Sequence, residues 1–173
     1  MAFKPAETFP GVVDFTNIDT AAKVQPGFIV RGIDTASGQG AGEFIYLPGI
    51  SGGTQFVGAL VTYNPLKPST SLATAAGALH NAIPLAVAMS AVTTASNFGW
   101  SQITGVATMK KTAVKVSPNV PIFVSATNGR ITAAAVSGKQ VLDAVTVNAA
   151  TVASATSTVQ VLLNRPCSQS QVI

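Results

Sequence analysis

The stretch that decides the fold is IFVSATNGRITAA, residues 122–134, in which an Asn-Gly pair separates two short apolar runs. Asn128 and Gly129 readily take the positive φ angles of a type I′ turn. The stretch therefore predicts a β-hairpin with a two-residue turn between residues 122–126 and 130–134. Both runs contain Val, Ile or Thr, residues that favour strands.

Eight further runs of Val, Ile, Thr and aromatic residues are separated by Gly, Pro, Asn and Ser, which favour turns. They are residues 28–31, 43–47, 55–63, 85–91, 100–104, 106–110, 140–147 and 158–163. Ten short strands predict an all-β fold, a β-sandwich or a barrel-like domain. Residues 71–81 are rich in Ala but Pro84 follows, so we expect one short helix there at most.

A chain of 173 residues is long enough for one domain with a hydrophobic core. Its N-terminal part contains Pro5 and Pro10 among spaced phenylalanines, a composition that favours an extended conformation. We therefore expect an extended N-terminal arm over residues 1–25, an all-β domain over residues 26–165 and a polar C-terminal tail over residues 166–173.

The composition is unusually poor in charge, because 9% of residues are charged and 47% are hydrophobic. An ordinary soluble domain carries roughly 25% charged residues. Between Phe44 and Met109 the only formally charged residue is Lys67. We expect this middle part to be buried, partly as core and partly as a subunit interface, since a large exposed apolar area usually marks a partner surface.

Residues for catalysis are scarce, because a Ser-His-Asp or Cys-His arrangement would have to use the single histidine, His80. One histidine and one cysteine, Cys167, cannot supply the ligands of a zinc site. The Gly-rich run at residues 38–42 is not followed by the Gly-Lys-Ser/Thr of a phosphate-binding loop. The sequence thus predicts no catalytic, cofactor-binding or metal-binding residues, and a protein that is not an enzyme.

Nucleic acid and membrane are also not expected as partners. The net charge is +4, and the basic residues are scattered apart from Lys110, Lys111 and Lys115, whereas nucleic-acid binding requires a concentrated basic stripe. The N-terminus lacks the pattern of a signal peptide, and no apolar run reaches the roughly 18 residues of a membrane span. A single cysteine fits a reducing cytoplasm as the place of synthesis.

Several strings point to a known family. They are GEFIYL at residues 42–47, VTY at 61–63, VAMS at 87–90, FGWSQI at 98–103 and GVA at 105–107. In this order, over roughly residues 42–165, the chain resembles the bacteriophage capsid decoration (cement, or head-stabilising) proteins. The resemblance implies a small virion protein, made in the host cytoplasm, that binds the outer surface of the capsid. It implies the major capsid protein and further copies of the chain as partners, commonly in a homotrimer, and no catalysis.

Aromatic residues are the candidate contact residues. Phe3, Phe9 and Phe15 in the expected arm are candidate anchors in the capsid, although the arm could equally dock on its own domain or trimer. Aromatics on predicted strands usually pack inside a protein, so a second group is assigned to the core or an oligomer interface. That group is Tyr46, Tyr63, Phe98 and Trp100.

Two alternatives remain within phage structural proteins, and a third lies outside them. A receptor- or glycan-binding module would use exposed aromatics such as Trp100 or Tyr46. A phage tail or fibre structural component is the other, and within this class a tail-tube or head-completion protein would usually assemble into rings or tubes, whereas a decoration protein would stay a small oligomer. A hydrolase of an unfamiliar all-β family would depend on His80.

Overall fold

The structure is a computed structural model that describes residues 3–6, 14–35, 37–50, 53–66, 68–78 and 81–169. Within them the chain forms twelve strands and one helix, α1 (Ala75–Ala78). The prediction of an all-β fold is confirmed, as is that of one short helix at most. Strand pairing is antiparallel throughout both sheets.

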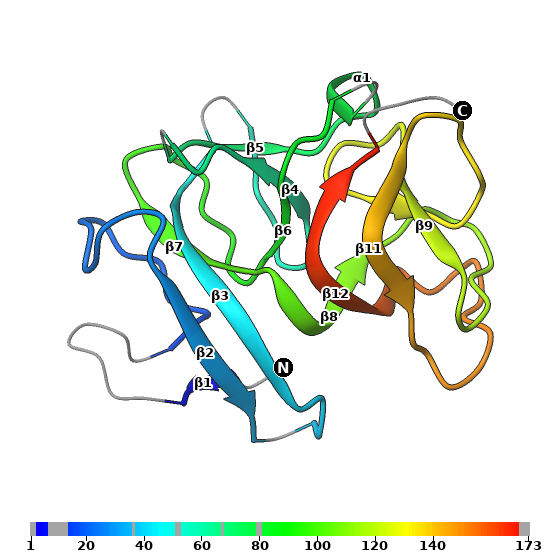
Figure 1. Ribbon diagram of the computed structural model, residues 1–173, viewed down its shortest axis with the longest axis horizontal. Coiled ribbons are helices and arrows are strands. Elements are labelled where there is room, and N and C mark those ends of the chain that lie inside the picture. The colour runs from blue at the N-terminus through cyan, green and yellow to red at the C-terminus, as the bar shows by residue number, and fades with distance from the viewer. Residues whose placement is uncertain are drawn as a thin grey trace.

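Two sheets lie side by side in the molecule (Figure 1). Sheet A has the strand order β1 (Phe3–Pro5), β2 (Ile29–Asp34), β3 (Ala41–Pro48), β7 (Phe98–Gln102), β6 (Leu85–Ala88), β4 (Leu60–Tyr63), β5 (Thr70–Leu72). Sheet B has the order β10 (Ile131–Thr132), β9 (Pro121–Val124), β11 (Gln140–Thr146), β12 (Thr158–Ser168), β8 (Thr104–Lys110). Ile103 alone separates β7 from β8, so the chain passes directly from one sheet into the other.

Sheet A curves into a half-barrel. A parallel bridge between Ile50 and Thr70 joins the residues after β3 to the start of β5, although these strands lie at distant places in the strand order. The concave side is filled by small and medium apolar side chains with almost no solvent exposure. They are Ile45, Leu47, Ala59, Val61, Ala86, Ala88 and Ile103. A tightly curved sheet leaves little internal space, which fits the small side chains of Ala59, Ala86 and Ala88 at these positions.

A second core lies between the sheets. Leu60, Leu85 and Val87 on the convex side of sheet A belong to the same buried cluster as Met109 and Val161 of sheet B. All four residues of β6 are therefore buried, alternately in the half-barrel and between the sheets. Burial on both faces explains why this part of the sequence carries almost no charge.

The third cluster incorporates part of the N-terminal segment. Phe15 is fully buried, and its ring stacks on Phe44 with 4.0 Å between the ring centroids and meets Trp100 edge-on at 5.3 Å. Asp19 forms a backbone bridge with Phe98. Residues 14–19 thus pack on their own domain instead of extending from it. Phe15 cannot serve as a capsid anchor while this packing is kept, so for this residue the structure shows the other alternative, docking on its own domain.

The other two predicted anchors are described less fully. Phe3 lies in β1, where it pairs with Asp34 of β2, and its side chain lies outside the described part of the chain. Phe9 lies outside the described residues altogether. Their role as anchors stays a prediction.

The deciding hairpin forms, but its turn differs from the prediction. The loop contains four residues, 126–129, and Ser125 N donates to Arg130 O at 3.1 Å. Gly129 alone in this loop has a positive φ, at 71°, whereas a type I′ turn would require a positive φ at Asn128 too. The Asn-Gly pair therefore predicted the position of the turn correctly, but the prediction of a two-residue turn was wrong.

Other differences concern strand ends. Two short strands, β1 and β5, were not predicted, and the predicted strand at residues 55–63 begins only at Leu60 because residues 57 and 58 form a turn. At the C-terminus β12 continues to Ser168, so residues 166–168 belong to the sheet and not to a polar tail. The extension is held by Ser168 N, which donates to Ile83 O at 3.0 Å.

Tyr46 offers a stability test of the third cluster. Its hydroxyl donates to Asp19 Oδ2 at 2.7 Å, and burial, followed by this hydrogen bond, raises the pKa of Tyr46 to about 12. The folded-state pKa lies above the unfolded value of 10.0, so this contribution to stability is complete below pH 10 and is lost between pH 10 and about 12. Tyr46→Phe should cost about 2 kcal/mol at pH 8, since a hydrogen bond to a charged group is lost.

The free energy of unfolding of wild type and Tyr46→Phe is measured at pH 8 and pH 11 by urea titration, with the fluorescence of the single tryptophan as the signal. The difference between wild type and Tyr46→Phe should shrink at the higher pH. Burial also raises the pKa of Tyr63, which adds the same alkaline loss to both proteins and does not affect the comparison. An unchanged difference at pH 11 would show that the Tyr46 hydroxyl does not contribute as argued.

Candidate interaction surfaces

The predicted strand aromatics lie in or against the core. Tyr46 and Trp100 are buried, and Phe98 packs against the same cluster. Tyr63 is partly buried against the cluster in the half-barrel. Burial of Tyr46 and Trp100 leaves neither ring exposed to stack on a sugar, so the glycan-binding alternative loses the two residues proposed for it.

One exposed surface follows β2. Its residues alternate in burial, with Val30, Gly32 and Asp34 turned inward and Ile29, Arg31 and Ile33 turned outward. Ile29 is 40% exposed and Ile33 is 48% exposed. An antiparallel sheet normally presents polar residues on its solvent face, so two large isoleucines there are unusual. We call Ile29, Arg31 and Ile33 the β2 stripe.

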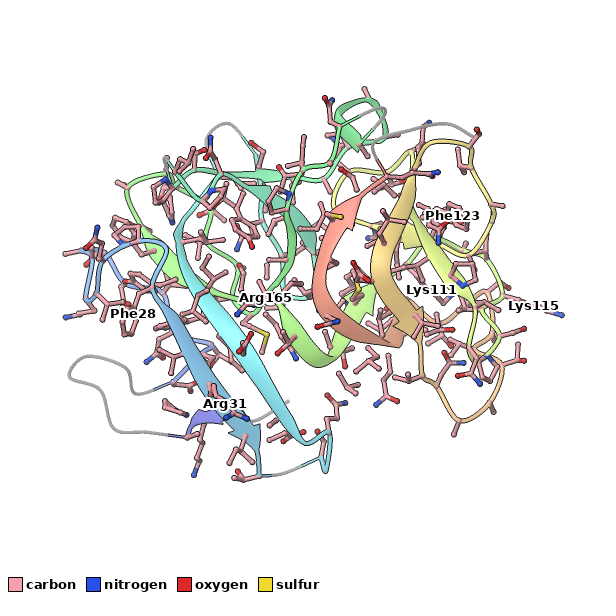
Figure 2. The ribbon with its side chains drawn as sticks, viewed as in Figure 1. Phe28, Arg31, Lys111, Lys115, Phe123 and Arg165 are labelled. Atoms are coloured by element: carbon pink, nitrogen blue, oxygen red, sulfur yellow. The ribbon has the colours of Figure 1, made fainter. Side chains whose placement is uncertain are left out.

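Beside this stripe lies a groove of about 420 Å³ between the β2–β3 ribbon and the strands β8 and β12. We call it the arginine groove. Its lining residues are Arg31, Ala41, Gly42, Glu43, Thr104, Asn164 and Arg165. Arg31 and Glu43 are cross-strand partners in β2 and β3, whereas Arg165 comes from β12. Figure 2 shows Arg31 and Arg165 on either side of β3.

An ion pair joins the two walls of the groove. Arg165 donates to Glu43 Oε2 from Nη2 at 3.1 Å and from Nε at 3.3 Å. The Arg165 side chain is still 61% exposed. Exposed ion pairs of this kind contribute little to stability, so the pair defines the shape and charge of the groove more than it holds the fold together.

The backbone at Arg165 is unusual. Its φ is 51°, and Asp143 on the neighbouring strand β11 has a φ of 57° at the place where the register between β11 and β12 shifts. Beyond the irregularity β12 still pairs with β11 but no longer with β8, and Cys167 forms a bridge with Pro84, the residue before β6 of sheet A. The end of β12 thus stays in sheet B and also contacts sheet A, and the irregularity lies where Arg165 reaches Glu43 of β3.

A second exposed apolar surface crosses sheet B. Val106, Leu162, Val145 and Pro121 are consecutive cross-strand partners on β8, β12, β11 and β9. Leu162 is 42% exposed and Pro121 is exposed, whereas the two valines are partly buried. Their strand neighbours, such as Val161, point into the core, so this sheet-B row lies on the opposite face. Phe123, two residues after Pro121, is on the same side of β9 (Figure 2).

The three clustered lysines do not act as one surface. Lys111 is 1% exposed, and its ammonium group donates to backbone carbonyls at Thr112, Val114 and Ser154. Lys115 is exposed. Lys111 is therefore a structural residue that ties two loops together.

Cys167 and His80 are the residues that could supply a reactive side chain. Cys167 lies within β12, and burial, followed by the nearby charge of Asp143, raises the pKa of its thiol and so disfavours the reactive thiolate. His80 lies outside the described residues. The part of the chain that the structure describes holds no group of three or more His, Cys, Asp or Glu side chains that could bind a metal. Among those residues the one short helix falls well below the length that a membrane-spanning helix requires.

The fold and these surfaces define an all-β protein with apolar strand faces and a small cationic groove. No family model matches the chain, and no curated protein or solved structure is detectably similar to it. A proposal about its function therefore rests on the residues and their arrangement.

Sequence reasoning did not single out the arginine groove. The alternation of Ile29, Arg31 and Ile33 was a readable signal for one unusual strand face. Arg165 and Glu43, however, are 122 positions apart, and only the register irregularity in β12 brings them together.

Proposed function

We propose that this chain is a structural virion protein that binds the outer surface of a phage capsid, as a small homo-oligomer, and stabilises the contacts between capsomers. The observation that supports the proposal is the β2 stripe. Large apolar side chains on the solvent face of a regular strand are characteristic of a partner surface. The major capsid protein and further copies of this chain are the partners that the family resemblance implies.

A rigid sheet suits this role. Strand residues are already ordered by backbone pairing, so docking them on a partner costs less conformational entropy than ordering a flexible loop. Each Å² of apolar surface removed from water contributes about 25 cal/mol. A modest contact per copy becomes large over a shell, because the same contact is repeated at every symmetry-related position.

The sheet-B row supports self-association. Four apolar side chains in line across four strands form a continuous apolar row, with Lys110 as the nearest basic residue on β8. Apolar strand faces without charges pack well against copies of themselves. We assign the sheet-B row to contacts between copies and the β2 stripe to the capsid.

Replacing both stripe isoleucines tests the proposal. Ile29→Thr with Ile33→Thr should weaken binding to undecorated capsids about 30-fold, because each substitution removes about 1 kcal/mol of apolar burial in the complex. Threonine keeps a β-branched side chain and so keeps the strand propensity. Co-sedimentation with purified capsids measures the affinity, and light scattering measures the oligomer.

Leu66→Thr is the matched control. Leu66 is 91% exposed but lies in the loop between β4 and β5, away from the stripe, so this variant should bind like the wild type. Failure of the wild type to bind capsids, or its spontaneous growth into tubes, would reject the decoration role and favour a tail component. Equal binding by the double variant and the wild type would reject the β2 stripe as the contact.

A further inference from the structure

The arginine groove has an unbalanced charge. Arg165 is paired with Glu43, while Arg31 makes no hydrogen bond or ion pair with another side chain within the described part of the chain. Two guanidinium groups and one carboxylate line the same space, so the groove carries a net positive charge. A group that brings one negative charge would neutralise it.

The donors of the groove are arranged to receive such a group. Arg31 and Glu43 face each other across β2 and β3, and Arg165 approaches Glu43 from β12. A guanidinium has five N–H donors, and Arg165 directs only two of them to Glu43. The remaining donors of both arginines match the two oxygens of a carboxylate, which arginine binds in a bidentate manner.

The backbone conformation adds an independent observation. Left-handed φ angles at residues other than glycine cost about 1–3 kcal/mol each, and they concentrate at binding and catalytic sites. Arg165 and Asp143 both adopt such angles at the same irregularity. The strain accompanies a geometry that places the Arg165 side chain over the groove, where a regular β12 would not bring it to β3.

We propose that the arginine groove binds the carboxylate of an Asp or Glu side chain on the partner protein, with apolar residues on either side of that acid packing on Ile29 and Ile33. The inference rests on the proposed function for the identity of the partner, the capsid protein. The two isoleucines flank Arg31 at alternate positions of β2, so an extended segment with alternating apolar and acidic residues fits the stripe and the groove together.

An acidic side chain fits better than a phosphate. Glu43 stands in the groove and repels a doubly charged anion more strongly than a single carboxylate. The isoleucines beside the groove favour a ligand with apolar groups next to its acid, and the sugar-phosphate backbone of a nucleic acid has no such groups.

Binding of small probes tests the chemistry directly. The probes are the peptide acetyl-Ile-Glu-Ile-amide, its glutamine analogue and inorganic phosphate, titrated while the arginine side-chain signals are followed by NMR. The glutamate peptide should shift the Arg31 and Arg165 Nε signals, and the glutamine peptide should not. Equal shifts with both peptides, no shift with either, or a stronger response to phosphate would overturn the proposal.

Capsid co-sedimentation tests its role in attachment. Arg31→Glu should weaken binding at least about tenfold, because a like charge then faces the partner's acid, and Arg31→Ala should weaken it less. Wild-type binding should fall as salt is raised, and the fall should be smaller for Arg31→Ala. Lys115→Ala removes an equal charge at the far end of the molecule from Arg31 (Figure 2) and should leave binding unchanged.

The outcomes separate the two proposals. If the wild type binds capsids and Arg31→Glu binds equally well, the groove is not part of the attachment site, although the decoration role stands. If the wild type binds no capsid, the decoration role fails, and the peptide titration alone decides whether the groove takes a carboxylate.

Discussion

Lys111→Met will lower the free energy of unfolding by about 3 kcal/mol, because three backbone carbonyls then lose their charged donor. The Lys111 ammonium group donates to Val114 O at 2.8 Å and to Thr112 O and Ser154 O at 3.3 Å. Methionine fills nearly the same space but donates nothing. Replacing both partners of a buried ion pair with apolar residues is often harmless, but the partners here are backbone groups that no substitution removes.

The pH dependence adds a second readout. Burial lowers the pKa of Lys111 below its ordinary value of 10.5, so near that pH the unfolded chain binds the proton more strongly than the folded one. Stability from this group therefore increases as pH rises toward 10.5. The difference between wild type and Lys111→Met should grow between pH 7 and pH 10.

Lys110→Met is the matched control for chemical denaturation of these variants. Lys110 is the preceding residue on β8, and its partly exposed side chain points away from the buried cluster. It should change stability by less than about 0.5 kcal/mol, as surface substitutions usually do. Equal stability of Lys111→Met and the control would mean that the carbonyls find other donors and that Lys111 does not join the two loops.

Gly105→Val will lower the free energy of unfolding by about 4 kcal/mol, through backbone strain and through separation of the two sheets. Gly105 has a φ of 85°, a region in which an L side chain costs about 1–2 kcal/mol. A Cβ there would overlap the carbonyl oxygen of Ala41 and lie 3.0 Å from Gly42 Cα. Since both obstacles are backbone atoms of β3, that strand must move, which adds about 1–3 kcal/mol.

Gly38→Val separates the two contributions. Gly38 has a φ of 71°, but no atom lies within 4 Å of a Cβ built there, so this variant carries the strain alone and should lose about 1–2 kcal/mol. Differential scanning calorimetry of both variants provides the comparison. Equal losses would show that the close approach of β8 and β3 can relax without cost.

Local patterns predicted most strand positions, because they depend on side-chain alternation and turn residues near each other in the chain. Each of the ten predicted strands overlaps an observed one. The two that were missed, β1 and β5, have three residues each, too few to show a pattern. Local propensity could not predict the length of the loop that contains Gly129 either. Gly129 N donates to Ala73 O, and Gly129 O accepts from Leu60 N, so two distant segments hold this loop in place.

By itself the sequence determined the all-β class, the place of the turns and the charge-poor middle part, because these follow from local propensity and composition. Only the tertiary structure decided which apolar residues are buried: the sequence left open whether Phe15 docks on its own domain, and it lies in the core, whereas Ile29 and Ile33 lie outside. It alone formed the arginine groove, because the irregularity in β12 sets Arg165 against Glu43. Contacts between residues so far apart depend on strand register and sheet curvature, which no local pattern records.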